Sequence, residues 1–252
     1  MDAIAKEPDA AGEASASPRV AYRHRLPTRI WHWVNAITLF VMLMSGLMIF
    51  NAHPHLYWGQ YGANFDQPWL SFSGRPIPSW ATIPSYYSLA GARRWHLAFA
   101  WLLVIGLAAF LITSFFNRHM QRDLAPAPSE LHPAHIWHDV KEHARLRFPT
   151  GDAALRFNIL QKLSYVGVIF LLLPLMILTG LTMSPAMDAA WPWLLVVFDG
   201  RQSARSIHFI VAVLLVLFIL VHLAMVVLAG PINEIRSMIT GRYRVPPDRS
   251  ER

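Results

Sequence analysis

Four stretches of the chain are apolar and contain no Asp, Glu, Lys or Arg, at residues 31–50, 95–116, 163–183 and 207–228. Each stretch holds 20 to 22 residues, and a bilayer core about 30 Å thick needs roughly 20 helical residues to cross it. Apart from a closed β-barrel, a helix is the structure that satisfies its own backbone hydrogen bonds in lipid. The pattern therefore predicts an all-α membrane protein, built as a bundle of four transmembrane helices.

The composition agrees with this prediction and limits the chemistry. Of the 252 residues, 54% are hydrophobic and 15% are charged, whereas a soluble domain carries about 25% charged residues. The chain has no cysteine and 12 histidines. The lack of cysteine excludes disulfides, thiolate-bound zinc, thiolate-bound iron–sulfur clusters and covalently attached haem. Histidine is left as the obvious metal ligand.

Lysine and arginine are distributed unevenly between the segments that flank the spans. The N-terminal segment, the connection between spans two and three, and the C-terminal segment hold 17 of the 22 basic residues, and the other two connections hold five. Basic residues are enriched on the cytoplasmic side of a membrane protein. We therefore expect both termini in the cytoplasm. The net charge of +7 is then a signal of topology, and we expect no nucleic-acid partner.

Three parts follow from these patterns. Residues 1–18 are polar and rich in small residues, which predicts a disordered cytoplasmic tail. Residues 19–242 form the four-helix domain, and 243–252 form a second cytoplasmic tail. The outer connection, residues 51–94, contains nine aromatic residues and five prolines. It is either an aromatic belt on the lipid surface or a docking platform for an extracytoplasmic partner.

Four histidines lie inside the apolar spans, where an ionisable side chain is costly and marks a candidate functional site. His208 and His222 are 14 residues apart, which is roughly 21 Å along a helix and about 40° short of four full turns. They share one face, with His208 at the outer level and His222 at the inner level. His32 begins span one at the inner level, and His96 begins span two at the outer level. The positions predict two stacked pairs, His32 with His222 and His96 with His208.

Two imidazoles from different helices suit the axial positions of a haem iron, whose other ligands come from the porphyrin. Zinc would need three or four protein ligands at each site. We therefore expect two non-covalent b haems with iron ligated on both sides, which favours electron transfer over chemistry at the metal. Arginines beside the two sites are candidates to bind haem propionates, with ordinary interfacial anchoring as the alternative: Arg25, Arg29, Arg94 and Arg205.

A short stretch of sequence is repeated in spans one and three. Ser45-Gly46-Leu47-Met48 resembles Thr179-Gly180-Leu181-Thr182, and both stretches lie near the end of a span. Small residues at these positions allow close approach of helices, or of a flat cofactor to the backbone.

Several short motifs resemble a known family over residues 20–242. They are Arg29-Ile-Trp-His32-Trp33, Arg94-Trp-His96, Arg205-Ser-Ile-His208 and Val221-His222. In these the chain resembles the membrane di-haem cytochrome b subunits of nickel–iron hydrogenases, formate dehydrogenases and thiosulfate reductases. The resemblance implies a respiratory electron-transfer subunit in a bacterial inner membrane, without activity of its own. It would connect a hydrogenase or a molybdopterin oxidoreductase outside the cytoplasm to membrane quinone.

The resemblance also implies a quinone site. Members of the formate dehydrogenase type carry Tyr-Asn-x-x-Gln-Lys at the cytoplasmic start of span three, beside the inner haem. Here the stretch is Phe157-Asn158-Ile-Leu-Gln161-Lys162, with Phe in place of Tyr. By resemblance, Asn158 and Gln161 are candidates to hydrogen-bond a quinone carbonyl, and Lys162 is a candidate proton or charge partner. The alternative is a polar cap at the start of the helix.

Other functions stay open from the residues alone. One is a stand-alone, quinone-linked haem oxidoreductase similar to superoxide oxidases. Another is a transporter of protons or metal ions, although no Asp or Glu lies in any of the four spans. Between spans two and three, a histidine-rich stretch is either an interfacial amphipathic helix or a metal site: His132, His135, His138 and His143.

Overall fold

The computed structural model describes residues 19–62, 66–118, 120 and 125–247. Four helical segments in this part are long and apolar enough to cross a membrane, which confirms the predicted number of spans. Each begins before the predicted apolar stretch, because charged residues in the first turns stay helical while their side chains reach toward the headgroups. The four segments are α1 (Leu26–Ala52), α2 (Leu89–Phe116), a composite segment over Gly151–Thr182, and α8 (Arg201–Ala229).

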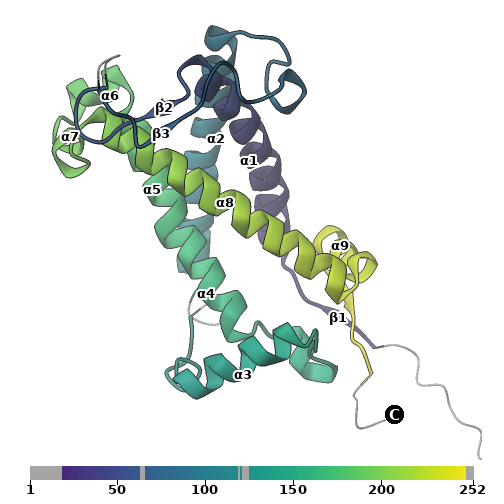
Figure 1. Ribbon diagram of the computed structural model, residues 1–252. Helices are drawn as coiled ribbons and strands as arrows, with labels where there is room; N and C mark the ends of the chain where they lie inside the picture. The colour runs from purple at the N-terminus through teal and green to yellow at the C-terminus, as the bar shows by residue number, and fades with distance from the viewer. Residues whose placement is uncertain (1–18, 63–65, 119, 121–124, 248–252) are drawn as a thin grey trace, which may run out of the picture.

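The third span is a helix with a local change of geometry. It consists of α4 (Ile159–Gly167), a π-helical segment η4 (Val168–Leu172) and α5 (Leu173–Thr182), which form one rod in Figure 1. Pro174 is the second residue of α5, and a proline inside a helix removes a backbone donor and pushes against the preceding turn. The wider π turn accommodates that proline. Such turns are frequent at functional sites.

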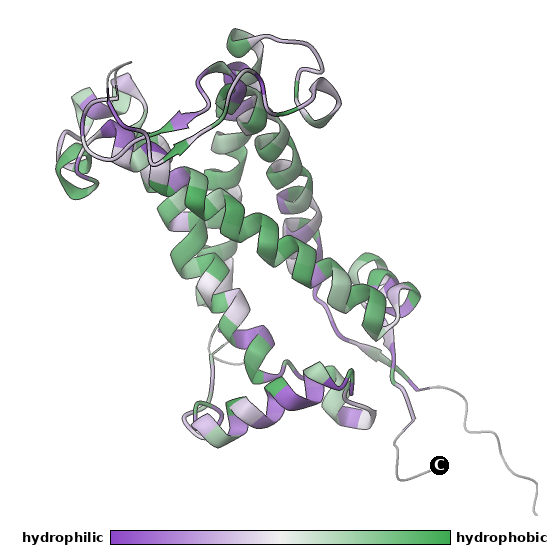
Figure 2. Ribbon diagram, viewed as in Figure 1, coloured by the Kyte–Doolittle hydropathy of each residue, from purple (hydrophilic) through white to green (hydrophobic). Residues whose placement is uncertain are grey.

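The spans are apolar outside and carry hydroxyl groups inside. In the most hydrophobic span, α8, only 11% of the central window is buried, so most of its apolar side chains face outward, where lipid would cover them. Figure 2 shows α8 as apolar along most of its length after the polar first turns. The buried polar residues of the spans are small, and such residues allow helices to approach closely when lipid does not drive them together. They include Thr38, Ser45, Ser114, Thr179, Thr182, Ser203 and Ser206.

The helices pack mainly as two pairs, α1 with α2 and α5 with α8. A continuous apolar core joins the pairs, and it includes Met42 of α1, Leu107 of α2, Leu173 of α5 and Val211 of α8. This arrangement leaves α1 and α8 facing each other at one end of the bundle, and α2 and α8 at the other.

The long connection between α1 and α2 is held against the start of α8. It contains β2 (His55–Leu56), β3 (Leu70–Ser71) and the 3-10 turn η1 (Ser79–Ala81). Ser206 donates to the Tyr57 carbonyl at 2.5 Å and accepts from the Trp69 indole N–H at 2.9 Å. Arg205 donates to the carbonyls of His53 and His55. The connection is therefore anchored to α8 within three residues of His208.

Two features make this anchor tight. Gly200, which begins α8, has a φ of +97°, and a Cβ there would stand 2.7 Å from the Cα of Gln60. Only glycine allows both that backbone conformation and that approach. Burial, the Arg205 guanidinium and the neighbouring His55 all lower the pKa of His53, so the His53 ring is neutral at pH 7 beside the guanidinium.

The opposite end of the bundle carries both ends of the described chain (Figure 1). Strand β1 (Val20–Tyr22) pairs antiparallel with β4 (Arg242–Arg244), and Val245 N–H donates to the Arg19 carbonyl. The pairing thus includes the first residues of the predicted C-terminal tail, whereas the tail predicted for 1–18 lies outside the described residues. Arg23 forms an ion pair with Glu234 at 3.1 Å and lies over the Tyr243 ring. Glu234 belongs to α9 (Pro231–Thr240).

The remaining elements are short and lie at the two ends. Helix α3 (Pro133–Ala144) carries the histidine-rich stretch, has no buried residue and lies beside the start of α4, where Figure 2 shows mixed polar and apolar positions. The turn η3 (Gly151–Leu155) follows it. At the other end, α6 (Pro185–Ala190) and α7 (Trp193–Val197) connect α5 to α8.

The orientation of the bundle in the membrane stays a prediction of the basic-residue distribution, and single cysteines test it without background because the chain has none. Ser85→Cys lies in the long connection and Ser129→Cys precedes α3, and both positions are exposed. In intact cells, a membrane-impermeant maleimide should label Ser85→Cys and leave Ser129→Cys unlabelled until the membrane is opened. The reverse pattern would place the termini outside the cytoplasm.

Candidate functional site

Two pairs of histidines face each other inside the bundle, one pair near each end. His96 of α2 and His208 of α8 have ring centres 6.2 Å apart, with 59° between the ring planes. His32 of α1 and His222 of α8 have ring centres 6.3 Å apart, with 57° between the planes. We name them the loop-end pair and the termini-end pair. Because α8 is one continuous helix, its two histidines lie roughly 21 Å apart along the axis.

The separation within each pair fits one iron between two rings. A metal–imidazole bond is about 2 Å long and a ring nitrogen lies roughly 1 Å from its ring centre, so two rings on opposite sides of one iron have centres roughly 6 Å apart. Two imidazoles joined by a direct hydrogen bond would have centres roughly 5 Å apart. The measured 6.2 and 6.3 Å agree with the first arrangement.

The loop-end pair is held by hydrogen bonds from the neighbouring helices. His96 Nδ1 lies 3.1 Å from the Ser45 hydroxyl and 3.1 Å from the Met42 carbonyl, both on α1. His208 Nδ1 lies 2.9 Å from the Thr179 hydroxyl on α5. A ligating histidine usually donates its second ring N–H to such a partner, which orients the ring and makes it a better ligand.

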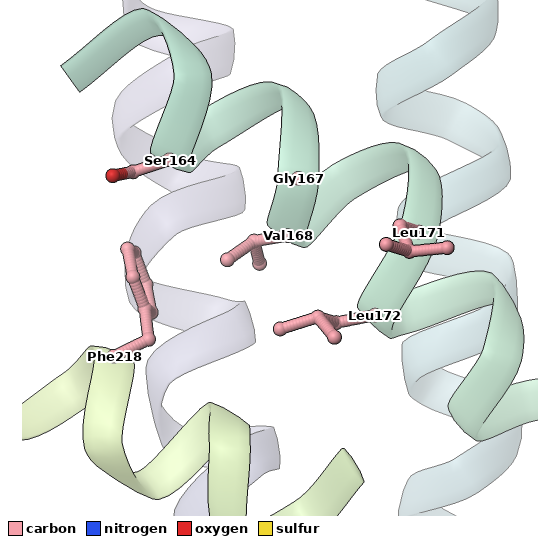
Figure 3. Close-up of a pocket in the computed structure, with 6 residues that line it drawn as sticks. All are labelled: Ser164, Gly167, Val168, Leu171, Leu172 and Phe218. Atoms are coloured by element: carbon pink, nitrogen blue, oxygen red, sulfur yellow. The ribbon is translucent and has the colours of Figure 1, made fainter. Parts of the chain in front are cut away.

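The termini-end pair has different surroundings. His32 Nδ1 is buried and has no hydrogen-bond partner among the described residues. The Phe218 ring stacks on His222, with centres 5.9 Å apart and 17° between the planes. Beside Phe218 lies a groove of about 270 Å³ between α8 and the α4–η4 segment, and Figure 3 shows Val168, Leu172 and Phe218 pointing into it. A Cβ at Gly167 would meet no other atom within 4 Å, so this flank is open and apolar.

The arrangement does not suit zinc or another ion that needs three protein ligands. Among the described residues, no group of three or more His, Cys, Asp or Glu side chains comes together. This holds as well for the three histidines of α3 and for His132 directly before it, all of which are described. Two ligands at each site suit a group that supplies the remaining coordination positions itself, as a porphyrin does.

Comparison with known proteins identifies the family of the chain. The model of a family described as prokaryotic cytochrome b561 matches residues 23–241. The chain belongs to this family. As a b-type cytochrome of the membrane it is a multi-pass electron-transfer protein, and its family implies haem b as the cofactor.

Several relatives of this cytochrome b match most of their own length. The putative protein-methionine-sulfoxide reductase subunit YedZ1 of Azospira oryzae is 27% identical over 79% of this chain and 87% of its own. A probable Ni/Fe-hydrogenase B-type cytochrome subunit of Cupriavidus necator is 23% identical over 92% of this chain and 90% of its own. Another, from Azotobacter vinelandii, is 24% identical over 91% of this chain and 91% of its own. No solved structure matches this cytochrome b significantly.

Of the four arginines proposed for haem propionates, two donate hydrogen bonds to backbone carbonyls and two are exposed. Arg29 donates to the Ile239 carbonyl of α9, and Arg205 donates to the two loop carbonyls. Arg25 and Arg94 are exposed, and within the described residues their side chains form no ion pair. A guanidinium has five N–H donors, so Arg29 and Arg205 keep donors for a second partner.

The three residues proposed for quinone are joined in one network at the start of α4. Asn158 and Gln161 form a capping box, in which Asn158 Oδ1 accepts from Gln161 N–H at 2.9 Å and Gln161 Oε1 accepts from Asn158 N–H at 3.2 Å. Asn158 Nδ2 lies 3.0 Å from His143 Nε2. Lys162 donates to Glu130 at 2.7 Å, and this hydrogen bond lowers the pKa of Glu130, so the Glu130 carboxylate is ionised at neutral pH.

The role of these partners was not visible in the sequence. The sequence marks Ser45 and Thr179 only as small residues. Their hydrogen bonds to histidines on other helices depend on helix rotation, which the sequence does not give. The signal was the repeated hydroxyl–glycine pair. Glu130 gives no signal of its own, because a glutamate in a polar connection is ordinary, and the sequence marks His143 only as part of the histidine-rich stretch.

Removal of single histidines tests the pairing. His96→Ala and His208→Ala should each remove the same component of the reduced b-haem spectrum, and His32→Ala and His222→Ala should each remove the other, because one lost ligand leaves its iron with one imidazole. His138→Ala, at an exposed position of α3, is the control and should leave both components. A common loss in His32→Ala and His208→Ala would contradict the pairing.

Proposed function

We propose that this cytochrome b carries two b haems and passes electrons across the membrane between an extracytoplasmic redox enzyme and the quinone pool. The observation that supports this most strongly is the presence of two separate histidine pairs near opposite ends of one bundle. A single redox centre can serve a partner on one side, whereas two stacked centres connect both sides.

The protein supplies ligation and insulation for this reaction. Haem b, when bound, supplies a one-electron couple that needs no open coordination position. His96 and His208 would hold one iron, and His32 and His222 the other. Because both histidines of each pair would be used to hold the iron, the sites would favour electron transfer over binding of a substrate at the metal. The apolar core between the pairs excludes water from the path.

At the termini end, arginine donors would bind the haem propionates, with Arg25 and Arg29 on this side. At the loop end, Arg94 and Arg205 would do the same. Propionates and guanidinium groups match as forked, charge-assisted pairs. For Arg29 and Arg205, the same side chain would then bridge a propionate to the backbone of α9 or of the long connection.

The long connection is the proposed surface for the redox partner, a hydrogenase or a molybdopterin oxidoreductase. Its exposed Trp58 stacks on Trp69, with ring centres 5.7 Å apart, and Trp69 bonds to Ser206, two residues before His208. The surface is thus continuous with the loop-end pair. The relatives, which are named as subunits of a methionine-sulfoxide reductase and of nickel–iron hydrogenases, support a redox enzyme as partner. By the basic-residue distribution, this side faces out of the cytoplasm of a bacterium, across its inner membrane.

Quinone would react beside the termini-end pair, at the start of α4. An amide NH₂ has two donors; Asn158 directs one to His143 and keeps the other for a quinone carbonyl. Gln161 holds Asn158 in place through the capping box. The Lys162–Glu130 pair provides a charged group near the surface for proton exchange.

The order of electron transfer is testable by mixing the oxidised, purified protein with a short-chain quinol in a stopped-flow instrument. His96→Ala should keep rapid reduction of the remaining haem, because the termini-end pair next to the quinone site is intact. His222→Ala should leave the loop-end haem to be reduced slowly, because its direct electron donor is gone. Equal rates in the two variants would contradict a quinone site at the termini end.

The role of Asn158 is separable from its role as a helix cap. Asp caps a helix as well as Asn does but has no NH₂ group, so Asn158→Asp keeps the cap and loses the donor. Loss of one neutral hydrogen bond, about 1 kcal/mol, corresponds to roughly a fivefold decrease in quinol turnover. Steady-state assays should show this decrease in Asn158→Asp and Asn158→Ala, with both haems retained. Turnover at the wild-type rate in Asn158→Asp would leave Asn158 as a cap only.

A further inference from the structure

A six-residue pattern occurs twice, and each copy holds a histidine of another helix. Residues 42–47 of α1 and 176–181 of α5 both read Met-x-x-(Ser/Thr)-Gly-Leu. The first copy contacts His96 on α2, and the second contacts His208 on α8. Each copy lies on the helix that packs against the one carrying its histidine. The two histidines are the members of the loop-end pair.

The hydroxyl protons of the two copies are already used within their own helices. Ser45 donates to the Val41 carbonyl and Thr179 donates to the Leu175 carbonyl, both at 2.7 Å. A hydroxyl has one proton to donate and two lone pairs. Toward the histidine rings, Ser45 Oγ and Thr179 Oγ1 therefore act as acceptors.

A backbone carbonyl near each ring also indicates that the histidine acts as the donor. The Met42 carbonyl lies 3.1 Å from His96 Nδ1, and the Met176 carbonyl bonds to His208. A carbonyl oxygen accepts only, so the Met42 carbonyl assigns the proton of His96 to Nδ1. For His208, the acceptor Thr179 Oγ1 at Nδ1 makes the same assignment. The lone pair of each neutral imidazole is then on Nε2, the nitrogen available for a metal.

The glycine of each copy brings the helix backbone close to one side of the ring. A Cβ at Gly46 would stand 3.4 Å from His96 Cε1, and a Cβ at Gly180 would stand 3.5 Å from His208 Cε1. The imidazole thus lies where a larger side chain would project. The acceptors at Nδ1 limit rotation of the ring.

The termini-end pair lacks the equivalent contact at one of its rings. His32 Nδ1 is buried without a hydrogen-bond partner among the described residues. The two sites therefore offer iron the same ligand type with different support.

We propose that Ser45 and Thr179 are positioning residues for the loop-end haem, which fix the Nδ1–H tautomer and the ring angle of His96 and His208 and lower the reduction potential of that haem alone. The inference rests on the proposed two-haem function. A hydrogen bond from Nδ1–H to an acceptor increases the electron donation of the ligand nitrogen. Greater donation stabilises ferric over ferrous iron, which lowers the potential.

Potentiometric titration of the full-length protein in detergent tests this. Ser45→Ala and Thr179→Val remove the hydroxyls one at a time and together, and Ser45→Thr and Thr179→Ser are the matched controls that keep them. The loop-end component is identified as the one lost in His96→Ala. We expect its midpoint potential to rise in each hydroxyl-free variant and to rise furthest in the double variant. The other component and both controls should keep their wild-type potentials.

Low-temperature EPR of the oxidised protein provides a second measurement. The low-spin signal of a bis-imidazole haem depends on the angle between the ring planes, which is 59° at the loop end. The hydroxyl-free variants should shift the loop-end signal alone. Unchanged potentials and signals, equal shifts at both haems, or the same shift in the hydroxyl-bearing controls would each overturn the assignment. A wild-type protein without two b haems would instead refute the proposed function.

Discussion

The proposed function depends on two imidazoles from different helices that lie opposite each other with enough room for one iron. This constraint is met twice, and α8 takes part both times, because its histidines lie on one face of an unbroken helix. The remaining helices are placed by that requirement. The first helix must bring His32 to one end of α8, and the second must bring His96 to the other. The packing of α1 against α2 allows both.

Polar contacts within the spans give the bundle its specificity. Apolar side chains facing lipid stabilise insertion but do not select one helix rotation over another. Hydroxyls that bond to a carbonyl of their own helix and to a histidine of the next one do select it, because a rotation of either helix breaks the contact. The anchors from Ser203, Arg205 and Ser206 to the long connection have the same effect at the start of α8. The loop-end pair is thus fixed from both sides.

Much of this organisation follows from sequence alone, since length, apolar runs and the position of a histidine within a run determine the number of spans and the depth of each ring. Depth alone brings His32 toward His222 and His96 toward His208. Contacts that depend on helix rotation do not follow in the same way, and Ser45 with His96 is an example. The π turn near Pro174 depends on how the backbone of one helix adjusts to the proline ring. The pairing of β1 with β4 joins residues more than 200 positions apart, and two three-residue strands leave no pattern that predicts it.

The central claim is that the protein holds one b haem at each of two histidine pairs. A pyridine haemochrome assay combined with quantitative amino-acid analysis of the purified protein measures this directly. The account predicts two extractable b haems per chain. A folded protein that contains none, or that saturates at one haem per chain, would contradict it.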